Sequence, residues 1–321
     1  MTAETGNLSK SNSFALQDKL FEGTTRFFAL LVLVTLLAII GSLFMGSWQT
    51  LSQTGPKFFA TNTWDPVKSA FGGLAPLWGT IITATIALVI GVPLSFGIAV
   101  FLTEMCPPVL KRPLGTAVEL LAAILSIIYG MWGLFIFAPL FAETLQPFMI
   151  ATLGKLPVIG ILFQGTPNGF GVFTAGLILA VMIIPFIAAV MRDVFETTPP
   201  ILKESAYGLG ATTWEVVWNV VLPYTKAGVI GGIMLGLGRA LGETMAVTFV
   251  IGNAYKISPR LFDPGNSIAS SLANEFNEAS DPAHLSALIT LGLTLFVLSF
   301  VVLAISRWML ASLTAKEGKR T

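Results

Sequence analysis

Charged and redox-active residues are scarce in this chain of 321 residues. Asp, Glu, Lys and Arg make up 11% of it, against 54% hydrophobic residues, which excludes an ordinary soluble domain and is typical of an integral membrane protein. The single cysteine, Cys106, excludes an internal disulfide and a CxxC site, and the single histidine excludes a histidine-rich metal site. A net charge of +1 gives no basis for binding nucleic acid.

Apolar runs, in contrast, are long and numerous. About 20 residues in a helix cross about 30 Å of hydrocarbon, and six runs reach that length. We therefore expect an all-α integral membrane protein with six transmembrane helices. Their approximate positions are 27–48, 76–102, 116–140, 171–191, 227–251 and 285–310.

The segments around these runs define the expected domains. Residues 1–26 and 312–321 are polar tails, 49–74 form a loop, and 75–311 form a core that holds the other five helices. Residues 141–170 are expected to be a loop with interfacial helices, because their apolar patches are too short to cross a membrane.

Basic residues predict the orientation. Six spans place both termini on one side, and Lys and Arg are enriched in cytoplasmic segments. The side of the termini holds twelve such residues and the other side five, so both termini and residues 196–225 are expected in the cytoplasm. The twelve are Lys10, Lys19, Arg26, Lys111, Arg112, Arg192, Lys203, Lys226, Arg307, Lys316, Lys319 and Arg320, and the five are Lys57, Lys68, Lys155, Lys256 and Arg260.

Residues 196–225 separate two apolar runs with a polar segment that we expect to contain two short helices. Thr198 is predicted to N-cap the first helix, with Pro199 at its first position, where the missing N–H costs nothing. Gly210 is predicted to end it, since glycine easily takes the left-handed conformation that follows a helix. The segment is then either an ordinary connector or a rigid surface for a partner.

The second short helix is predicted to begin at Thr212 or Thr213. Thr212 and Glu215 have the spacing of a capping box, in which each side chain accepts a bond from the backbone N–H of the other residue. Pro223 is predicted to limit the far end of this helix, because proline disrupts a helix interior.

Glycines recur along the fifth apolar run. Gly228, Gly232 and Gly236 repeat every four residues, and Gly238 and Gly242 form another such pair. Stripes of small residues let helix backbones approach closely. We therefore expect this helix to pack tightly against a neighbour.

Arg239 and Glu243 lie near the middle of the same run. They are four residues apart, so on a helix they would share one face and could pair. An unpaired charge at this depth costs from about 3 kcal/mol upward. The pair is either a structural ion pair or part of a substrate path, and the second reading is favoured because hydrophobic packing would avoid the desolvation of a purely structural pair. Arginine suits phosphate-like oxyanions, since its planar fork donates two parallel hydrogen bonds, and the glutamate would neutralise it in an empty path.

The polar segment resembles the cytoplasmic loop of ABC importer permeases. That signature reads EAA, three residues, glycine, nine residues and I-x-L-P, and here 204–206, Gly210 and 220–223 keep the same spacing. Ser205 and Val220 replace the usual alanine and isoleucine, which are small changes. In that family the loop docks into a groove of the ATPase. The residues that the resemblance assigns to this coupling loop are Lys203, Glu204, Ser205, Ala206, Gly210, Ala211, Thr212, Leu222 and Pro223.

Longer stretches resemble the phosphate-specific permeases of the PstC type. They are Lys111–Phe135, Gly236–Ala254 and Ser271–Ala279, and the similarity covers roughly residues 70–310 and the preceding span. Leu125 stands where this family usually has proline, so the helix there is expected to be straighter.

The resemblance implies a type I ABC importer permease fold in the bacterial inner membrane. The implied partners are a homologous permease beside this chain, a homodimeric ATPase below it and a periplasmic phosphate-binding protein above it, with phosphate as the substrate and lipid around the spans. The ATPase would use ATP and Mg, so no cofactor is expected on this chain, which lacks a Walker motif and a nucleophile–base set. Closure of the ATPase would push on residues 199–222, and Pro223 would pass the force to Arg239 and Glu243.

Other readings stay open. A secondary anion transporter or channel would explain the intramembrane charges but not the spacing of the loop. The same ATP-driven machine would serve another oxyanion, such as sulfate or molybdate. A membrane sensor of phosphate is a further alternative.

Overall fold

A computed structural model describes residues 5–157 and 160–317 of the chain. Within them, six helices are long and apolar enough to cross a membrane, which confirms the expected all-α membrane fold. These spans are Gln17–Gln53, Leu74–Met105, Ser126–Lys155, Val172–Glu196, Thr213–Leu241 and Pro282–Ser312. Parts of the two expected tails, residues 1–4 and 318–321, lie outside the described residues.

The spans are built from α-helices joined by short π- and 3₁₀-helical turns, with one small hairpin. The α-helices are α1 (Thr5–Gln53), α2 (Leu74–Val100), α3 (Pro108–Ala122), α4 (Ser126–Trp132), α5 (Ala138–Leu140), α6 (Gln146–Thr152), α7 (Val172–Glu196), α8 (Pro200–Gly208), α9 (Thr213–Val216), α10 (Leu222–Leu241), α11 (Met245–Thr248), α12 (Ile268–Glu275) and α13 (Pro282–Glu317). The π-helical turns are η2 (Phe101–Met105), η3 (Gly133–Phe137), η4 (Phe141–Leu145) and η7 (Val217–Val221), and the 3₁₀ turns are η1 (Gly55–Phe59), η5 (Leu153–Lys155) and η6 (Gly160–Phe163). Strands β1 (Trp64–Asp65) and β2 (Ala70–Phe71) pair antiparallel.

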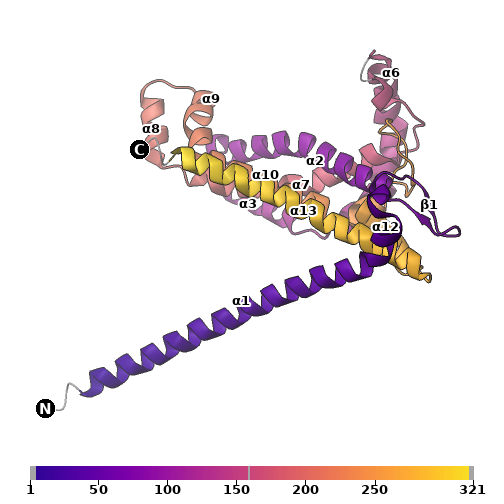
Figure 1. The fold of residues 1–321 in the computed structure, drawn as a ribbon. Helices are drawn as coiled ribbons and strands as arrows, with labels where there is room; N and C mark the ends of the chain where they lie inside the picture. Colours follow the sequence, from indigo (N-terminus) through magenta and orange to yellow (C-terminus); the bar gives the residue numbers. More distant parts are fainter. Residues whose placement is uncertain (1–4, 158–159, 318–321) are drawn as a thin grey trace.

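Helix α7 forms the centre of the bundle (Figure 1). It packs against α2, α10 and α3, and its residues Ile183, Ile187 and Met191 are fully buried. A helix that is apolar on all sides buries the most surface when neighbours surround it, so this sequence favours the central position.

The glycine stripe of α10 faces α7. A Cβ atom added at each glycine would crowd a β-branched side chain of α7, so the two backbones are as close as the sequence predicted. The distances would be 2.5 Å from Gly228 to Val194, 3.0 Å from Gly232 to Val190 and 2.5 Å from Gly236 to Ile187.

Helix α1 leaves the bundle at an angle and is joined to it at its C-terminal end (Figure 1). There Ser286 of α13 donates a hydrogen bond of 2.8 Å to the Gly46 carbonyl, and Thr50 donates one of 3.0 Å to the Ser286 hydroxyl. The helix begins at Thr5, so residues 5–26, which were expected to form a polar tail, are helical and continuous with the first span.

The third span differs from the expected helix at 116–140. Helix α3 ends at Ala122, and Leu125 takes an extended conformation (φ −63°, ψ 137°) before α4 begins. The expectation of a straighter helix at Leu125 is therefore wrong. The break occurs without a proline, and the Tyr129 hydroxyl donates across it to the Leu121 carbonyl at 2.9 Å.

The same span then continues through α4 to η5 and ends at Lys155. The expected loop at 141–170 is therefore helical in its first part. Pro139 and Pro147 each lie in the first turn of an α-helix that follows a π-helical turn. Such positions tolerate proline, since π turns rearrange the backbone hydrogen bonds that proline would remove.

Candidate functional site

Helices α8 and α9 project from one end of the bundle, opposite the end that carries β1, α6 and α12 (Figure 1). Gly210 follows α8 with a φ of +87°, a left-handed conformation that favours glycine, so the predicted end of this helix is confirmed. The predicted capping box is also confirmed. The Thr212 N–H donates to Glu215 Oε2 at 2.8 Å, and the Glu215 N–H donates to Thr212 Oγ1 at 3.4 Å.

The start of α8 differs from the prediction by one residue. Pro199 is the N-cap and Pro200 is the first helical residue, while the Thr198 hydroxyl is buried without a hydrogen-bond partner among the described residues. The predicted Thr198 cap is therefore wrong. A residue that precedes proline is pushed out of the helical region, and Pro199 accordingly has a ψ of 130°.

Pro223 does not end the second short helix, so this prediction is also wrong. Helix α9, the π turn η7 and α10 form one span from Thr213 to Leu241. Pro223 lies in the first turn of α10, directly after the π turn, where its missing N–H interrupts the helix least. The helix that begins in the loop thus continues into the span of Arg239 without a non-helical break.

The predicted coupling-loop residues divide into two groups. Five are exposed, namely Glu204, Ser205, Gly210, Thr212 and Pro223, and four are half-buried, namely Lys203, Ala206, Ala211 and Leu222. Ala206, Ala211 and Leu222 pack against the main hydrophobic core. The half-buried group therefore attaches the two helices to the bundle, and the exposed group is free to contact another molecule.

Large apolar side chains also stand exposed on these two helices. Leu209, at the tip between α8 and α9, is 91% exposed, and Ile201 and Trp214 are exposed as well. An apolar surface of this kind, placed beside polar groups, is typical of a protein–protein contact. Glu204 makes no hydrogen bond or ion pair with any residue that the structure describes, so its carboxylate is available to such a partner.

Lys203 has a different position. Its Nζ lies 2.5 Å from Oε1 of Glu104, at the end of the second span, and the two side chains are only 18% and 6% exposed. This ion pair joins α8 to η2 across 99 residues of sequence. Lys203 therefore binds within the chain rather than toward a partner.

Arg239 is half-buried in α10, and its guanidinium carbon lies 5.4 Å from the centre of the Phe186 ring of α7. Glu243 lies beyond the end of this helix, because Gly242 is the C-cap of α10. Its Oε1 instead accepts a 3.2 Å hydrogen bond from the Ala246 N–H at the start of α11. The ion pairs of the described residues do not include Arg239 with Glu243, so the expected pairing on one helix face is absent here.

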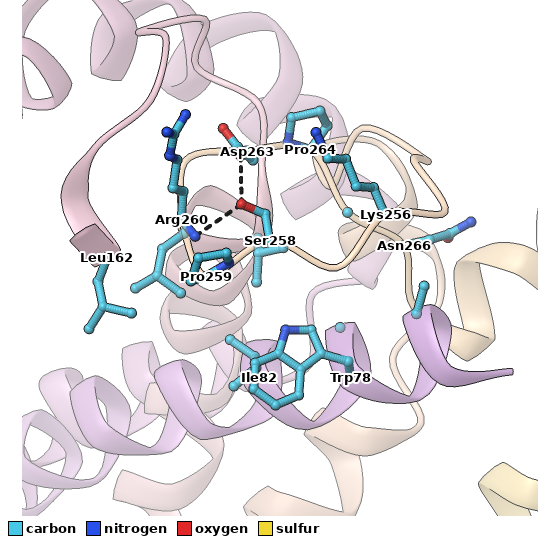
Figure 2. A pocket seen from close by; sticks show the side chains of 15 residues that line it. Trp78, Ile82, Leu162, Lys256, Ser258, Pro259, Arg260, Asp263, Pro264 and Asn266 are labelled. Atoms are coloured by element: carbon cyan, nitrogen blue, oxygen red, sulfur yellow. Dashed lines mark hydrogen bonds between the residues drawn. The ribbon is translucent and has the colours of Figure 1, made fainter. Parts of the chain in front are cut away.

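The opposite end of the bundle contains a cavity of about 260 Å³ (Figure 2). Trp78 and Ile82 of α2 form its apolar base, and Lys256 and Arg260 belong to the loop above them. The Ser258 hydroxyl donates to Asp263 at 2.7 Å and accepts from the Arg260 N–H at 3.1 Å, which shapes this loop. From the sequence, Lys256 and Arg260 entered only the charge count for membrane orientation, and no local pattern indicated a cavity here.

A half-buried carboxylate organises the outer hairpin nearby. Glu275 of α12 accepts hydrogen bonds from Trp64 Nε1 at 2.7 Å and from the Tyr255 hydroxyl at 2.5 Å, and it lies 2.9 Å from His284 Nε2. The rings of Trp64 and Tyr255 stack at 4.8 Å. Burial, and then the bond to Glu275, raise the pKa of Tyr255 far above its usual value, so the phenol stays protonated and remains a donor.

No cluster of three or more His, Cys, Asp or Glu side chains that could hold a metal occurs in the described ranges. What the geometry does present is an exposed apolar surface at the α8–α9 end, of the kind found in protein–protein contacts.

Comparison with known proteins gives a consistent result. The family described as "Binding-protein-dependent transport system inner membrane component" matches residues 78–314. The chain is 62% identical over 303 residues to "Phosphate transport system permease protein PstC" of Pasteurella multocida (strain Pm70), covering 94% of each chain. It is 56% identical over 315 residues to the protein of the same name in Haemophilus influenzae, covering 97% of this chain and 100% of that one.

Solved structures share the fold at low sequence identity. A bacterial ABC transporter involved in the import of the acidic polysaccharide alginate matches with a TM-score of 0.58 and 16% identity, over 92% of this chain and 99% of that one. The MetNI methionine ABC transporter in an inward-facing conformation matches with a TM-score of 0.53 and 17% identity, over 74% and 94% of the two chains. The chain therefore has the permease fold of ABC importers.

Proposed function

We propose that this chain, which belongs to the family of binding-protein-dependent transport system inner membrane components, is a permease subunit. The transporter is an ATP-driven importer of inorganic phosphate. The chain is a multi-pass inner-membrane translocation component and not an enzyme. The observation that carries the phosphate assignment is the 62% identity, over 94% of each chain, to a permease named for phosphate transport.

We place both termini and the α8–α9 end in the cytoplasm. The excess of Lys and Arg on that side supports this orientation. The hairpin, α12 and the cavity of Figure 2 then face the periplasm. A phosphate-binding protein would dock on this outer end and release its ligand there.

The proposed partner on the cytoplasmic side is a homodimeric ATPase that binds ATP and Mg. Exposed Leu209, Trp214 and Glu204 support this docking site, because together they offer apolar area and an unpaired carboxylate. The continuous helix from Thr213 to Leu241 would then transmit the motion of the ATPase to Arg239.

A second, homologous permease is the proposed partner within the membrane. The exposed apolar flank of α1, which includes Leu33 and Leu37, supports a contact with this subunit or with lipid. Arg239 would contact phosphate in a path between the two permeases, since its fork matches a phosphate oxyanion. Phe186, 5.4 Å from the guanidinium carbon, would restrain the arginine in the empty path. Glu243, just beyond the end of α10, is the proposed counter-charge.

Uptake of labelled phosphate into vesicles that contain the reconstituted importer tests this function. We expect uptake to require ATP and the binding protein, and excess sulfate or molybdate not to compete. Uptake that persists without ATP under a proton gradient would instead support a secondary transporter, and competition by sulfate or molybdate would assign another oxyanion.

A further inference from the structure

We propose that a second cavity, between α3 and α7, binds a phosphate-type oxyanion. The cavity has a volume of about 340 Å³ and lies where α3 begins and α7 ends, next to α8. The proposed path at Arg239 does not include it.

Three cations line this cavity. Lys111 Nζ lies 3.0 Å from Glu196 Oε1, and Arg192 Nη2 lies 2.6 Å from Glu119 Oε1, so the two carboxylates that line the cavity are already neutralised. Arg112 makes no hydrogen bond or ion pair with the residues at 5–157 and 160–317. The lining thus holds one more cation than carboxylates, and the unpaired charge is that of Arg112. Asp193, which does not line the cavity, is paired with Arg192.

The Arg192 side chain is also held in place. Arg192, whose side chain is 14% exposed, donates through Nε and Nη2 to Asp193 at 3.2 and 2.7 Å, which fixes its guanidinium plane. Its Nη1 lies over Gly115, where a Cβ atom would come within 2.7 Å. Glycine at this position thus lets the guanidinium approach α3, and the Thr116 hydroxyl lines the cavity beside it.

A phosphate group suits these donors. Guanidinium and ammonium groups bind phosphate oxygens with charge-assisted hydrogen bonds, and Arg112 can offer two parallel ones. The N-terminus of α3, at Pro108 on the rim, adds partial positive charge. Lys111 and Arg192 are already paired with carboxylates. Arg112 is therefore the group whose charge a bound anion would neutralise.

Two sources supply this chemistry at the position of the cavity. In the orientation proposed above, on which this choice of sources rests, the cavity lies at the cytoplasmic surface of the membrane. Basic pockets between helices on that side bind the head groups of anionic lipids, and free inorganic phosphate reaches the same place from the cytoplasm. Either anion would neutralise Arg112 of α3, beside the ion pair of Arg192 with Glu119 that already joins α7 to α3.

A binding experiment on the full chain tests the proposal without ATP hydrolysis or transport. All variants carry Arg239→Gln, so that the proposed path contributes no phosphate binding. One arm measures labelled inorganic phosphate by equilibrium dialysis, in detergent with a neutral lipid. The other arm measures phosphatidylglycerol retained from phosphatidylglycerol–phosphatidylcholine nanodiscs, by native mass spectrometry.

We expect Arg112→Gln to weaken binding in one arm by about tenfold, the size of one charge-assisted hydrogen bond. Arg307→Gln is the matched control, because Arg307 is an exposed arginine on α13 that does not line the cavity. A loss in the dialysis arm identifies free phosphate, and a loss in the nanodisc arm identifies the lipid head group. Binding by Arg112→Gln equal to that of the control in both arms overturns the proposal.

Arg112→Lys keeps the experiment decisive if Arg112→Gln does not insert. Lysine retains the charge and loses the fork, so we expect binding between that of the parent and that of a variant without the cation. Binding unchanged from the parent would contradict recognition by the paired donors of the Arg112 guanidinium. Transport is not measured in either arm, so a failure here leaves the proposed import function untouched.

Discussion

Lys203 of α8 and Glu104 of η2 form an ion pair of 2.5 Å that is almost closed to solvent. The second span therefore holds one side of the α8–α9 pair, while α10 continues directly from the other side. Motion of α8 would reach both spans. We predicted only the route through Pro223 from the sequence, because a contact between residues 99 positions apart leaves no local signal.

Removal of one member of this pair should destabilise the protein. Lys203→Gln or Glu104→Gln leaves a charge without its partner in a largely buried site, and the free energy of unfolding should fall by about 3 kcal/mol. The double variant, which buries neither charge, should recover part of the loss. Thermal unfolding of the four proteins in detergent measures this cycle, and additive losses would show that the two residues do not interact.

Glu204→Lys should weaken ATPase recruitment without a change in folding. Glu204 is exposed and makes no bond within the described part of the chain, so its loss leaves the fold intact while the reversed charge repels a cationic partner group. Co-purification of the ATPase from membranes measures the effect. Glu143→Lys, an exposed reversal far from α8, is the control, and equal yields for both variants would count against docking at Glu204.

Gly210→Ala should disturb the angle between α8 and α9. Gly210 has a φ of +87°, which costs a residue with a Cβ about 1–2 kcal/mol, although the space around it is open. Gly208→Ala is the matched control, because Gly208 is equally open and lies inside α8, where alanine is the better residue. We expect reduced ATPase co-purification for the first variant alone, and an equal reduction for both would argue against a backbone cause.

Arg239→Gln should abolish phosphate uptake and leave assembly with the other subunits unchanged. The substitution removes the charge and the fork while keeping most of the side-chain length. Arg239→Lys should retain only part of the activity, because an ammonium group cannot donate two parallel bonds. Labelled-phosphate uptake, normalised to the assembled complex, measures both variants. Normal uptake by Arg239→Gln would remove this residue from the path.

Local chemistry explains the features that could be predicted. The Thr212–Glu215 capping box and the left-handed Gly210 depend on neighbouring backbone atoms, and both are present. Hydrophobic length sufficed for the number of spans. The misplaced cap at Thr198 is also local, and the rule for residues before proline would have moved it to Pro199.

The remaining differences come from tertiary packing. The π turn before Pro223 lets a proline lie inside a continuous span, and no sequence pattern marks such a turn. The break at Leu125 is spanned by a hydrogen bond from the Tyr129 hydroxyl to the Leu121 carbonyl, eight residues apart. Arg239 and Glu243 have helical spacing in the sequence, but α10 ends between them at Leu241. The roles of both charges in the path stay predictions.

In this account, ATP hydrolysis by the ATPase docked at the α8–α9 end drives phosphate import. Binding-protein-stimulated ATPase activity of the reconstituted complex tests it most directly, with wild-type and Glu204→Lys chains compared. We expect phosphate-loaded binding protein to stimulate hydrolysis by the wild-type complex, and the variant to lose this stimulation together with uptake. Phosphate uptake by the wild-type complex with no stimulation of hydrolysis would contradict the account.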